Sequence, residues 1–169
     1  MRSVIVAAPH TSNWDFIFFI LAAWSLKAPV RWMGKKEMFP LPVRWLFRRM
    51  GGIPIDRGAA GGVVAQMVSA FESGDPMAVV ITPEATRKRV DYWKSGFYRI
   101  ASEADVDVVF GSINSKVKEV GIVPGFHPSG DVKADMDIVR AFYSDTHGIN
   151  PEQFGPVQLR NEDNSVTKS

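Results

Sequence analysis

The chain contains no cysteine, which excludes disulfides, thiolate nucleophiles and cysteine-ligated metal sites. Long hydrophobic runs are also missing: the longest, 16–23, is far shorter than the roughly 20 apolar residues of a bilayer-spanning helix. Its three histidines are dispersed and lack the spacing that puts two metal ligands on one helical face, so we expect no metal. No signal-peptide pattern precedes the first apolar run. We therefore expect a soluble or peripheral protein, for which a reducing cytoplasm is compatible.

The length and composition predict one compact domain. The chain has 169 residues, of which 46% are hydrophobic and 22% charged, and we place the domain at 1–158 with a flexible polar tail at 159–169. Residues 1–100 carry 14 Lys and Arg against seven Asp and Glu, whereas residues 101–169 carry six against 11. The basic first half favours an anionic partner: a phosphate, a coenzyme, an acidic carrier protein or an anionic membrane. An uneven solvated surface is the alternative.

The hydrophobic pattern predicts alternating strands and helices. Short β-branched or apolar runs predict strands at 4–8, 30–33, 53–55, 78–81, 106–113 and 119–123. Patterns typical of helices lie at 14–25, 43–50, 63–71, 97–104 and 134–143. This alternation, without an internal repeat or a linker, predicts a single-domain α/β sandwich with a mixed, mostly parallel sheet flanked by helices.

Polar loops that follow predicted strands are the candidate sites, since α/β proteins place their sites there. His10 leaves the first strand and Asp15 enters the first turn of the next helix, so the two side chains can converge. A carboxylate on one imidazole nitrogen fixes the tautomer and leaves the other nitrogen free to accept a proton. The other interpretation of Asp15 is an acidic residue that stabilises a helix N-terminus.

Two further loops supply cations and a carboxylate. Arg57 follows the strand at 53–55 and offers a planar fork of donors for phosphate oxygens, although an ion pair with Asp56 is the commoner role. The sequence 82–89 combines Glu84, Thr86 and Arg87 with two more cations in one loop. The alternative interpretation is an ordinary basic loop exposed to solvent.

Together these loops resemble, in order and spacing, the blocks of the glycerol-3-phosphate and 1-acylglycerol-3-phosphate acyltransferase family. Its histidine–aspartate block looks like 10–15, and its lysine–glutamate block like Lys35-Lys36-Glu37. Its phosphate-binding block looks like 53–57, and its Pro-Glu-Gly-Thr-Arg block like 83–87. The resemblance covers roughly 4–128. Ala85 departs from the family glycine, so either the loop avoids a positive φ or the acceptor pocket is altered. The proline-centred fourth block has only a loose counterpart at 106–111, which lacks proline.

The resemblance implies direct acyl transfer from an acyl-CoA or acyl carrier protein thioester to a lysophospholipid hydroxyl, in phospholipid biosynthesis. His10 would be the general base and Asp15 would orient it. Arg57, with Arg87 and Lys35, would hold the acceptor phosphate. Glu84 and Thr86 would line the acceptor pocket. No cofactor is implied, and the enzyme would lie peripherally on the inner face of the cell membrane.

Other functions remain open. The same chemistry on an ornithine-lipid or glycolipid acceptor is one alternative, and a non-catalytic module that binds anionic lipid or nucleic acid is another. No nucleic-acid motif is present, which argues against the latter partner. His127 and His147 are interpreted as turn and helix-end residues. Seven aromatic residues are interpreted mostly as core, although those near Trp45, among three arginines, are alternatively a membrane-contacting surface: Phe16, Phe18, Phe19, Trp24, Trp32, Trp45 and Phe47.

Overall fold

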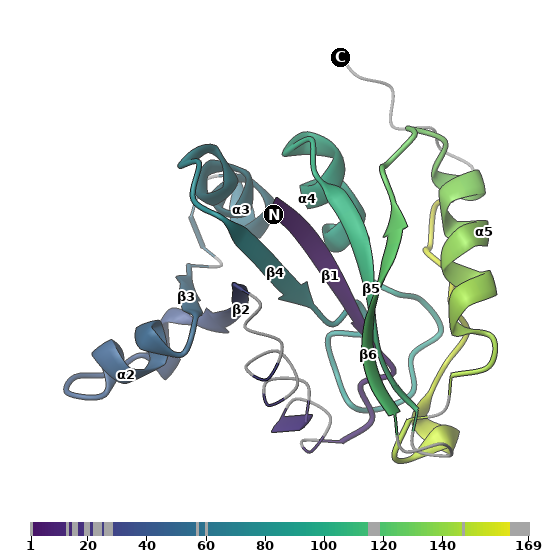
Figure 1. Ribbon diagram of the computed structural model, residues 1–169, viewed down its shortest axis with the longest axis horizontal. Coiled ribbons are helices and arrows are strands. Elements are labelled where there is room, and N and C mark those ends of the chain that lie inside the picture. The colour runs from purple at the N-terminus through teal and green to yellow at the C-terminus, as the bar shows by residue number, and fades with distance from the viewer. Residues whose placement is uncertain are drawn as a thin grey trace.

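A computed structural model describes residues 2–12, 14, 17, 18, 21, 25, 29–56, 58, 59, 61–114, 119–146 and 148–162. A six-stranded sheet forms the centre, in the order β3-β2-β4-β1-β5-β6 (Figure 1). Five strands are parallel, and β6 alone pairs antiparallel, with β5. The strands are β1 (Arg2–Ala8), β2 (Val30–Lys35), β3 (Gly52–Ile55), β4 (Met77–Ile81), β5 (Asp107–Asn114) and β6 (Glu119–Phe126).

Helices connect the strands and cover the sheet. Two short 3-10 turns that the sequence pattern did not predict accompany them, η1 (Lys36–Met38) and η2 (Pro151–Gln153). The α/β architecture with a mixed, mostly parallel sheet is confirmed. The helices are α2 (Arg44–Arg49), α3 (Gly62–Glu72), α4 (Gly96–Glu103) and α5 (Val132–Tyr143).

The core explains why β1 is central. Val4, Ile5 and Val6 are successive residues with at most 1% exposure, because both faces of this parallel strand are covered. On one face the main core joins the strands to α3, α4 and α5 through Phe71, Phe97 and related side chains. Ile5 belongs to a smaller cluster on the other face, with Val80 and Val109. The strand that leads into the histidine loop is therefore packed on both of its faces.

Most of the helix predicted at 14–25 lies outside the described residues, as do Phe16, Phe19 and Trp24. Of the aromatics predicted to be core, Trp32 is buried but Phe18 is 44% exposed and Trp45 66% exposed. The core interpretation is therefore wrong for these two rings, whereas the alternative for Trp45, an exposed surface among three arginines, agrees with its exposure.

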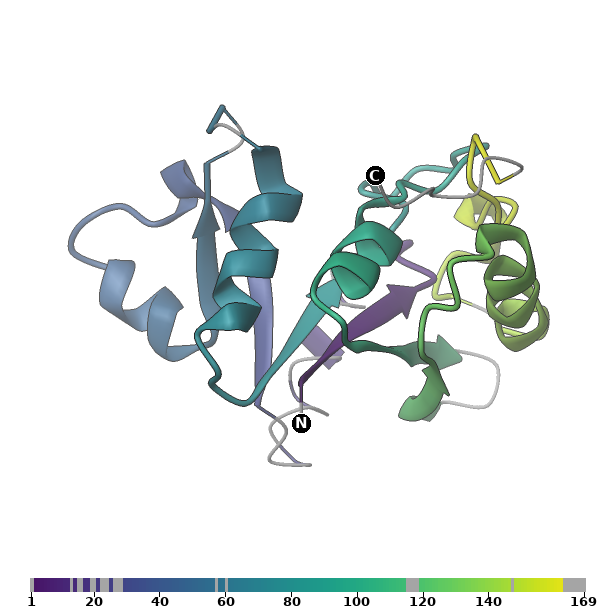
Figure 2. The same ribbon diagram turned by 90° about the horizontal axis from the view of Figure 1, so that it is seen from above.

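A projecting arm, residues 36–50, carries η1 and α2 at the opposite end of the molecule from α5 (Figure 2). It is fastened by stacking of Phe39 on Trp32, with Phe47 edge-on to both, and by a hydrogen bond from Trp32 Nε1 to the Met50 carbonyl at 3.0 Å. Within the part of the chain that is described, no helix has the length and apolarity needed to cross a membrane.

The last described residues return across the domain. Leu159 is only 6% exposed and forms a parallel bridge with Trp93. Glu162 accepts hydrogen bonds from Arg140 at 2.8 Å and from the Leu159 backbone at 2.6 Å. Residues 159–162 thus pack against the domain, whereas the rest of the predicted tail, 163–169, lies outside the described residues; the division at 158 stays a prediction.

Candidate active site

The parallel strands bring three of the sequence blocks to one edge of the sheet. Because β1, β2 and β4 run in the same direction, their carboxyl ends share that edge. His10 follows β1, Lys35 is the last residue of β2, and Glu84 follows β4. Residues separated by tens of positions in the chain therefore meet at one edge.

Glu84 is joined directly to the histidine loop. Glu84 is 4% exposed, and its Oε2 accepts a hydrogen bond from the backbone N–H of His10 at 2.6 Å. A short bond to an ionised acceptor is among the stronger hydrogen bonds in proteins. Glu84 therefore holds the main chain of His10, whose side chain is half-buried at this edge.

The turn after β4 has a left-handed residue. The backbone N–H of Ala85 donates to the Thr82 carbonyl at 3.0 Å, and Ala85 has φ of 55°. The loop therefore keeps the positive φ that a glycine adopts freely, which excludes the first of the two alternatives for Ala85, that the loop avoids a positive φ. Thr86 is half-buried and its Oγ1 accepts from the Lys88 backbone at 3.3 Å, while Arg87 is exposed.

Two cavities lie against this turn. One of about 410 Å³ is bounded by the ends of β2 and β4 and by α4, with Lys35, Thr82, Ala85 and Lys94 among its lining residues. The other, of about 760 Å³, is lined by Glu84 and Lys94 and extends between the loop at 90–95, α4 and Leu159. Lys94 lines both, and the sequence analysis missed it because an exposed lysine in a basic loop has no distinguishing pattern.

Tyr143 lies buried beneath the same edge. Its hydroxyl contacts the carbonyls of Val6 and Gly111 at 2.7 and 3.1 Å, so it ties β1 to β5. Burial, and secondarily the negative charge of Glu84, raise the pKa of Tyr143 well above its ordinary value. The hydroxyl stays neutral, and a fixed polar group underlies the strand that delivers His10.

Asp15 and Arg57 lie outside the described residues, so their predicted roles stay predictions. Where side chains are described, no cluster of three or more His, Asp or Glu is arranged to hold a metal. The described edge thus offers an imidazole whose backbone is fixed, a buried carboxylate, and two lysines beside a cavity. Such a set is suited to proton transfer next to an anionic ligand.

Comparison with known proteins agrees with this chemistry. Neither the curated proteins nor the solved structures contain a match to the chain. A family model described as Acyltransferase matches residues 1–114, which include every candidate site residue and β1 to β5. Because this match covers well over half of the 169 residues, the chain belongs to the acyltransferase family and is an acyltransferase enzyme.

Proposed function

We propose that the protein transfers a fatty acyl group from a thioester donor to the hydroxyl of 1-acylglycerol-3-phosphate or a similar lysophospholipid, in phospholipid biosynthesis. The observation that carries this proposal is the joining of His10 to buried Glu84 at the strand edge where Lys35 also ends. A general base beside a cationic cavity suits an acceptor molecule whose reacting hydroxyl lies close to its phosphate group.

In the proposed reaction the acceptor oxygen attacks the thioester carbonyl. His10 takes the hydroxyl proton as the new C–O bond forms, and the proton passes to the thiolate sulfur when the C–S bond breaks. Asp15 orients His10 and stabilises the imidazolium. General-base assistance of this kind supplies about 10²–10⁴-fold in rate. The donor, acyl-CoA or acyl carrier protein, is a co-substrate, and no cofactor takes part.

The acceptor phosphate is assigned to the cavity of about 410 Å³, where Lys35 and Lys94 provide the positive charge. Arg57 and Arg87 are assigned as further phosphate contacts and Thr86 as a pocket residue. Glu84 receives a different role from the one that the resemblance implied. Its nearly buried carboxylate is already engaged by the His10 backbone, so it supports the base instead of contacting the acceptor.

We further propose peripheral binding to the inner face of the cell membrane through the projecting arm. Leu41 is 84% exposed and Trp45 66% exposed, and Arg44, Arg48 and Arg49 lie among such apolar side chains. Exposed Trp and Leu beside cations suit the boundary between anionic headgroups and acyl chains. This placement would give the enzyme direct access to a lipid acceptor.

The proposed function is tested by mass spectrometry of lipid products formed from mixed donors and acceptors, with wild type and His10→Ala in parallel. We expect a diacylated phospholipid product whose formation falls by about 10²-fold or more in His10→Ala, with little loss of acceptor binding. A product from a non-phosphorylated acceptor, such as an ornithine lipid or glycolipid, would overturn the acceptor assignment alone. Wild-type turnover in His10→Ala would overturn the mechanism.

A further inference from the structure

Residues 148–162, here called the C-terminal strap, lie after α5 and beyond the family match. The strap contacts the histidine loop through Asn150, which makes two hydrogen bonds with Thr11. The Asn150 backbone N–H donates to Thr11 Oγ1 at 3.1 Å, and Asn150 Nδ2 donates to the Thr11 carbonyl at 3.0 Å. Thr11 is 5% exposed, so water does not readily replace either bond.

The approach of the strap to Thr11 is close as well as hydrogen-bonded. A side chain at Gly148 would place its Cβ 2.8 Å from Thr11 Oγ1 and 3.0 Å from its Cγ2. Only a residue without a Cβ lets the strap come this near. The strap and the loop therefore fit each other at two neighbouring positions, Gly148 and Asn150.

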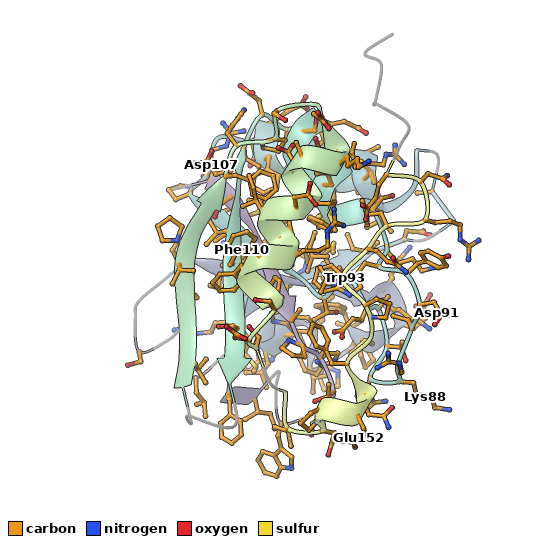
Figure 3. The ribbon with its side chains drawn as sticks, turned by 90° about the vertical axis from the view of Figure 1, so that its right-hand side faces the viewer. Lys88, Asp91, Trp93, Asp107, Phe110 and Glu152 are labelled. Carbon is orange, nitrogen blue, oxygen red and sulfur yellow. The ribbon has the colours of Figure 1, made fainter. Side chains whose placement is uncertain are left out.

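The same strap also holds the loop that carries Glu84. The Trp93 backbone N–H donates to the Gln158 carbonyl at 2.8 Å, and Gln158 Nε2 donates to the Asp91 carbonyl at 2.9 Å. Arg89 donates to the Phe154 carbonyl at 2.5 Å. Figure 3 shows η2, marked by Glu152, at the same end of the molecule as Lys88 of this loop. One segment thus connects both loops of the candidate site.

These contacts place His10 between two anchors. Glu84 fixes the peptide N–H of His10 itself, and Asn150 fixes the residue that follows. An imidazole can act as a base only when its backbone and its rotamer hold it within hydrogen-bond reach of the acceptor hydroxyl. A shift of about 1 Å in such a group can cost as much as 10²-fold in rate.

We propose that Asn150 is a positioning residue for acyl transfer, which clamps Thr11 so that His10 keeps its place as the base. The inference rests on the proposed role of His10. It predicts that Asn150 affects turnover and leaves the binding of both substrates nearly unchanged, because Asn150 is bonded to the histidine loop and lines neither cavity.

The first experiment compares steady-state kinetics and melting temperature of Asn150→Ala, Asn150→Asp and Glu152→Ala in the full chain. Asp keeps the size of Asn but presents an acceptor to the Thr11 carbonyl, so we expect Asn150→Asp to lose more turnover than Asn150→Ala. We expect kcat to fall by about 10-fold in Asn150→Ala and by more in Asn150→Asp, with both KM values within about 2-fold of wild type. Glu152→Ala, an exposed change on the same strap, should match wild type.

A double-mutant cycle separates positioning from general stability. If Asn150 acts through His10, the residual turnover of His10→Ala/Asn150→Ala equals that of His10→Ala alone. Independent effects, which multiply, would overturn the inference while leaving the proposed function intact. A wild-type rate in His10→Ala would instead remove the proposed function.

A second pair of variants keeps the test usable if the Asn150 variants fold poorly. Thr11→Ser retains the hydroxyl acceptor and should keep most of the turnover, whereas Thr11→Val removes it and should reduce kcat as Asn150→Ala does. Equal kcat values for Ser and Val at position 11, or a kcat loss that merely follows the fall in melting temperature, would also overturn the inference.

Discussion

The buried carboxylate of Glu84 and the backbone N–H of His10 are 74 positions apart in the chain and 2.6 Å apart in space. Glu84→Ala removes the acceptor, and we expect kcat to fall by at least about 10-fold because a charge-assisted hydrogen bond contributes roughly 1.5–3 kcal/mol. Glu84→Gln keeps an oxygen acceptor without the charge, so its kcat should lie between those of Glu84→Ala and wild type. Steady-state kinetics and thermal melting of both variants check this prediction. Equal kcat values for Glu84→Ala and Glu84→Gln would contradict it.

Ala85 holds a left-handed backbone, with φ of 55°, at a position where glycine is favoured. Ala85→Gly should stabilise the protein by about 0.5–1 kcal/mol, since the strain at this φ exceeds the extra unfolded-state entropy of glycine. Ala59→Gly is the matched control. Ala59 is exposed and has no positive φ, so this variant should be less stable than wild type. Urea unfolding measures both. Destabilisation of Ala85→Gly would show that the alanine methyl group makes a packing contribution that outweighs its strain.

Lys35 and Lys94 line the cavity that we assign to the acceptor phosphate. Lys35→Ala and Lys94→Ala should each raise the acceptor KM by several-fold to about 10-fold, with the donor KM nearly constant, because a cation–phosphate contact is lost. Lys88→Ala is the control, an exposed lysine of the adjacent loop that does not line this cavity. A change in the Lys88 variant as large as in the other two would mean a general electrostatic effect.

The raised pKa of Tyr143 makes stability fall at high pH. Burial, with a smaller contribution from Glu84, holds the phenol neutral in the folded state, while the unfolded phenol loses its proton near pH 10. The unfolded state therefore binds fewer protons above that pH, and the free energy of unfolding falls by up to about 1.4 kcal/mol per pH unit for this group. The pKa of Tyr98 is also raised, by burial and by Asp135, so this phenol makes stability fall at high pH in the same way.

Denaturant titrations between pH 8 and 11 test this dependence. Tyr143→Phe should be less stable near neutrality by about 1–3 kcal/mol, because the buried hydroxyl that bridges the Val6 and Gly111 carbonyls is lost, yet its stability should decline less steeply above pH 10. Tyr92→Phe, at an exposed ring on another loop, controls for removal of a hydroxyl. An alkaline slope unaltered by Tyr143→Phe would contradict the prediction.

The projecting arm should bind anionic vesicles. Charge reversal at Arg44, Arg48 and Arg49 should weaken flotation with such vesicles, and so should added salt, because the attraction is screened. Trp45→Ser should weaken binding even at low salt, since the buried apolar area is lost. Ile138→Ser, an exposed apolar residue on α5, is the matched control. Binding that is insensitive to the arm changes, or equally sensitive to Ile138→Ser, would exclude the arm as the membrane contact.

The sequence pattern was sufficient for the strands because their signal is local. Val4, Val6 and Val79 are buried in parallel strands, and runs of buried β-branched residues are recognisable without knowing their partners. The direction of the strands then predicts that loops after β1, β2 and β4 share an edge. The gathering of His10, Lys35 and Glu84 there follows from that rule.

Contacts between distant loops were beyond the sequence pattern. Nothing near Asn150 indicates that it bonds Thr11, because the partner lies 139 positions away and an asparagine after a helix reads as an ordinary turn residue. Glu84 was predicted to line the acceptor pocket, and its hydrogen bond to the His10 backbone was not predicted, since a carboxylate in a turn can face a ligand or a backbone amide. For Trp45 the sequence pattern left two interpretations, because an aromatic ring in an amphipathic pattern is usually core, and only its 66% exposure excludes the core.

The contact between Thr11 and Asn150 can form only after both segments have been synthesised. Asn150 is added to the nascent chain 139 residues after Thr11, the residue that it clamps. At about 5–20 residues per second, roughly 7–28 s of translation separate the two. In the later part of that interval, after residue 87, the nascent chain carries all of the sequence blocks from 10–15 to 83–87 but not yet the segment that clamps the histidine loop. The proposed proton-transfer geometry can therefore be completed only after residue 150 has been synthesised.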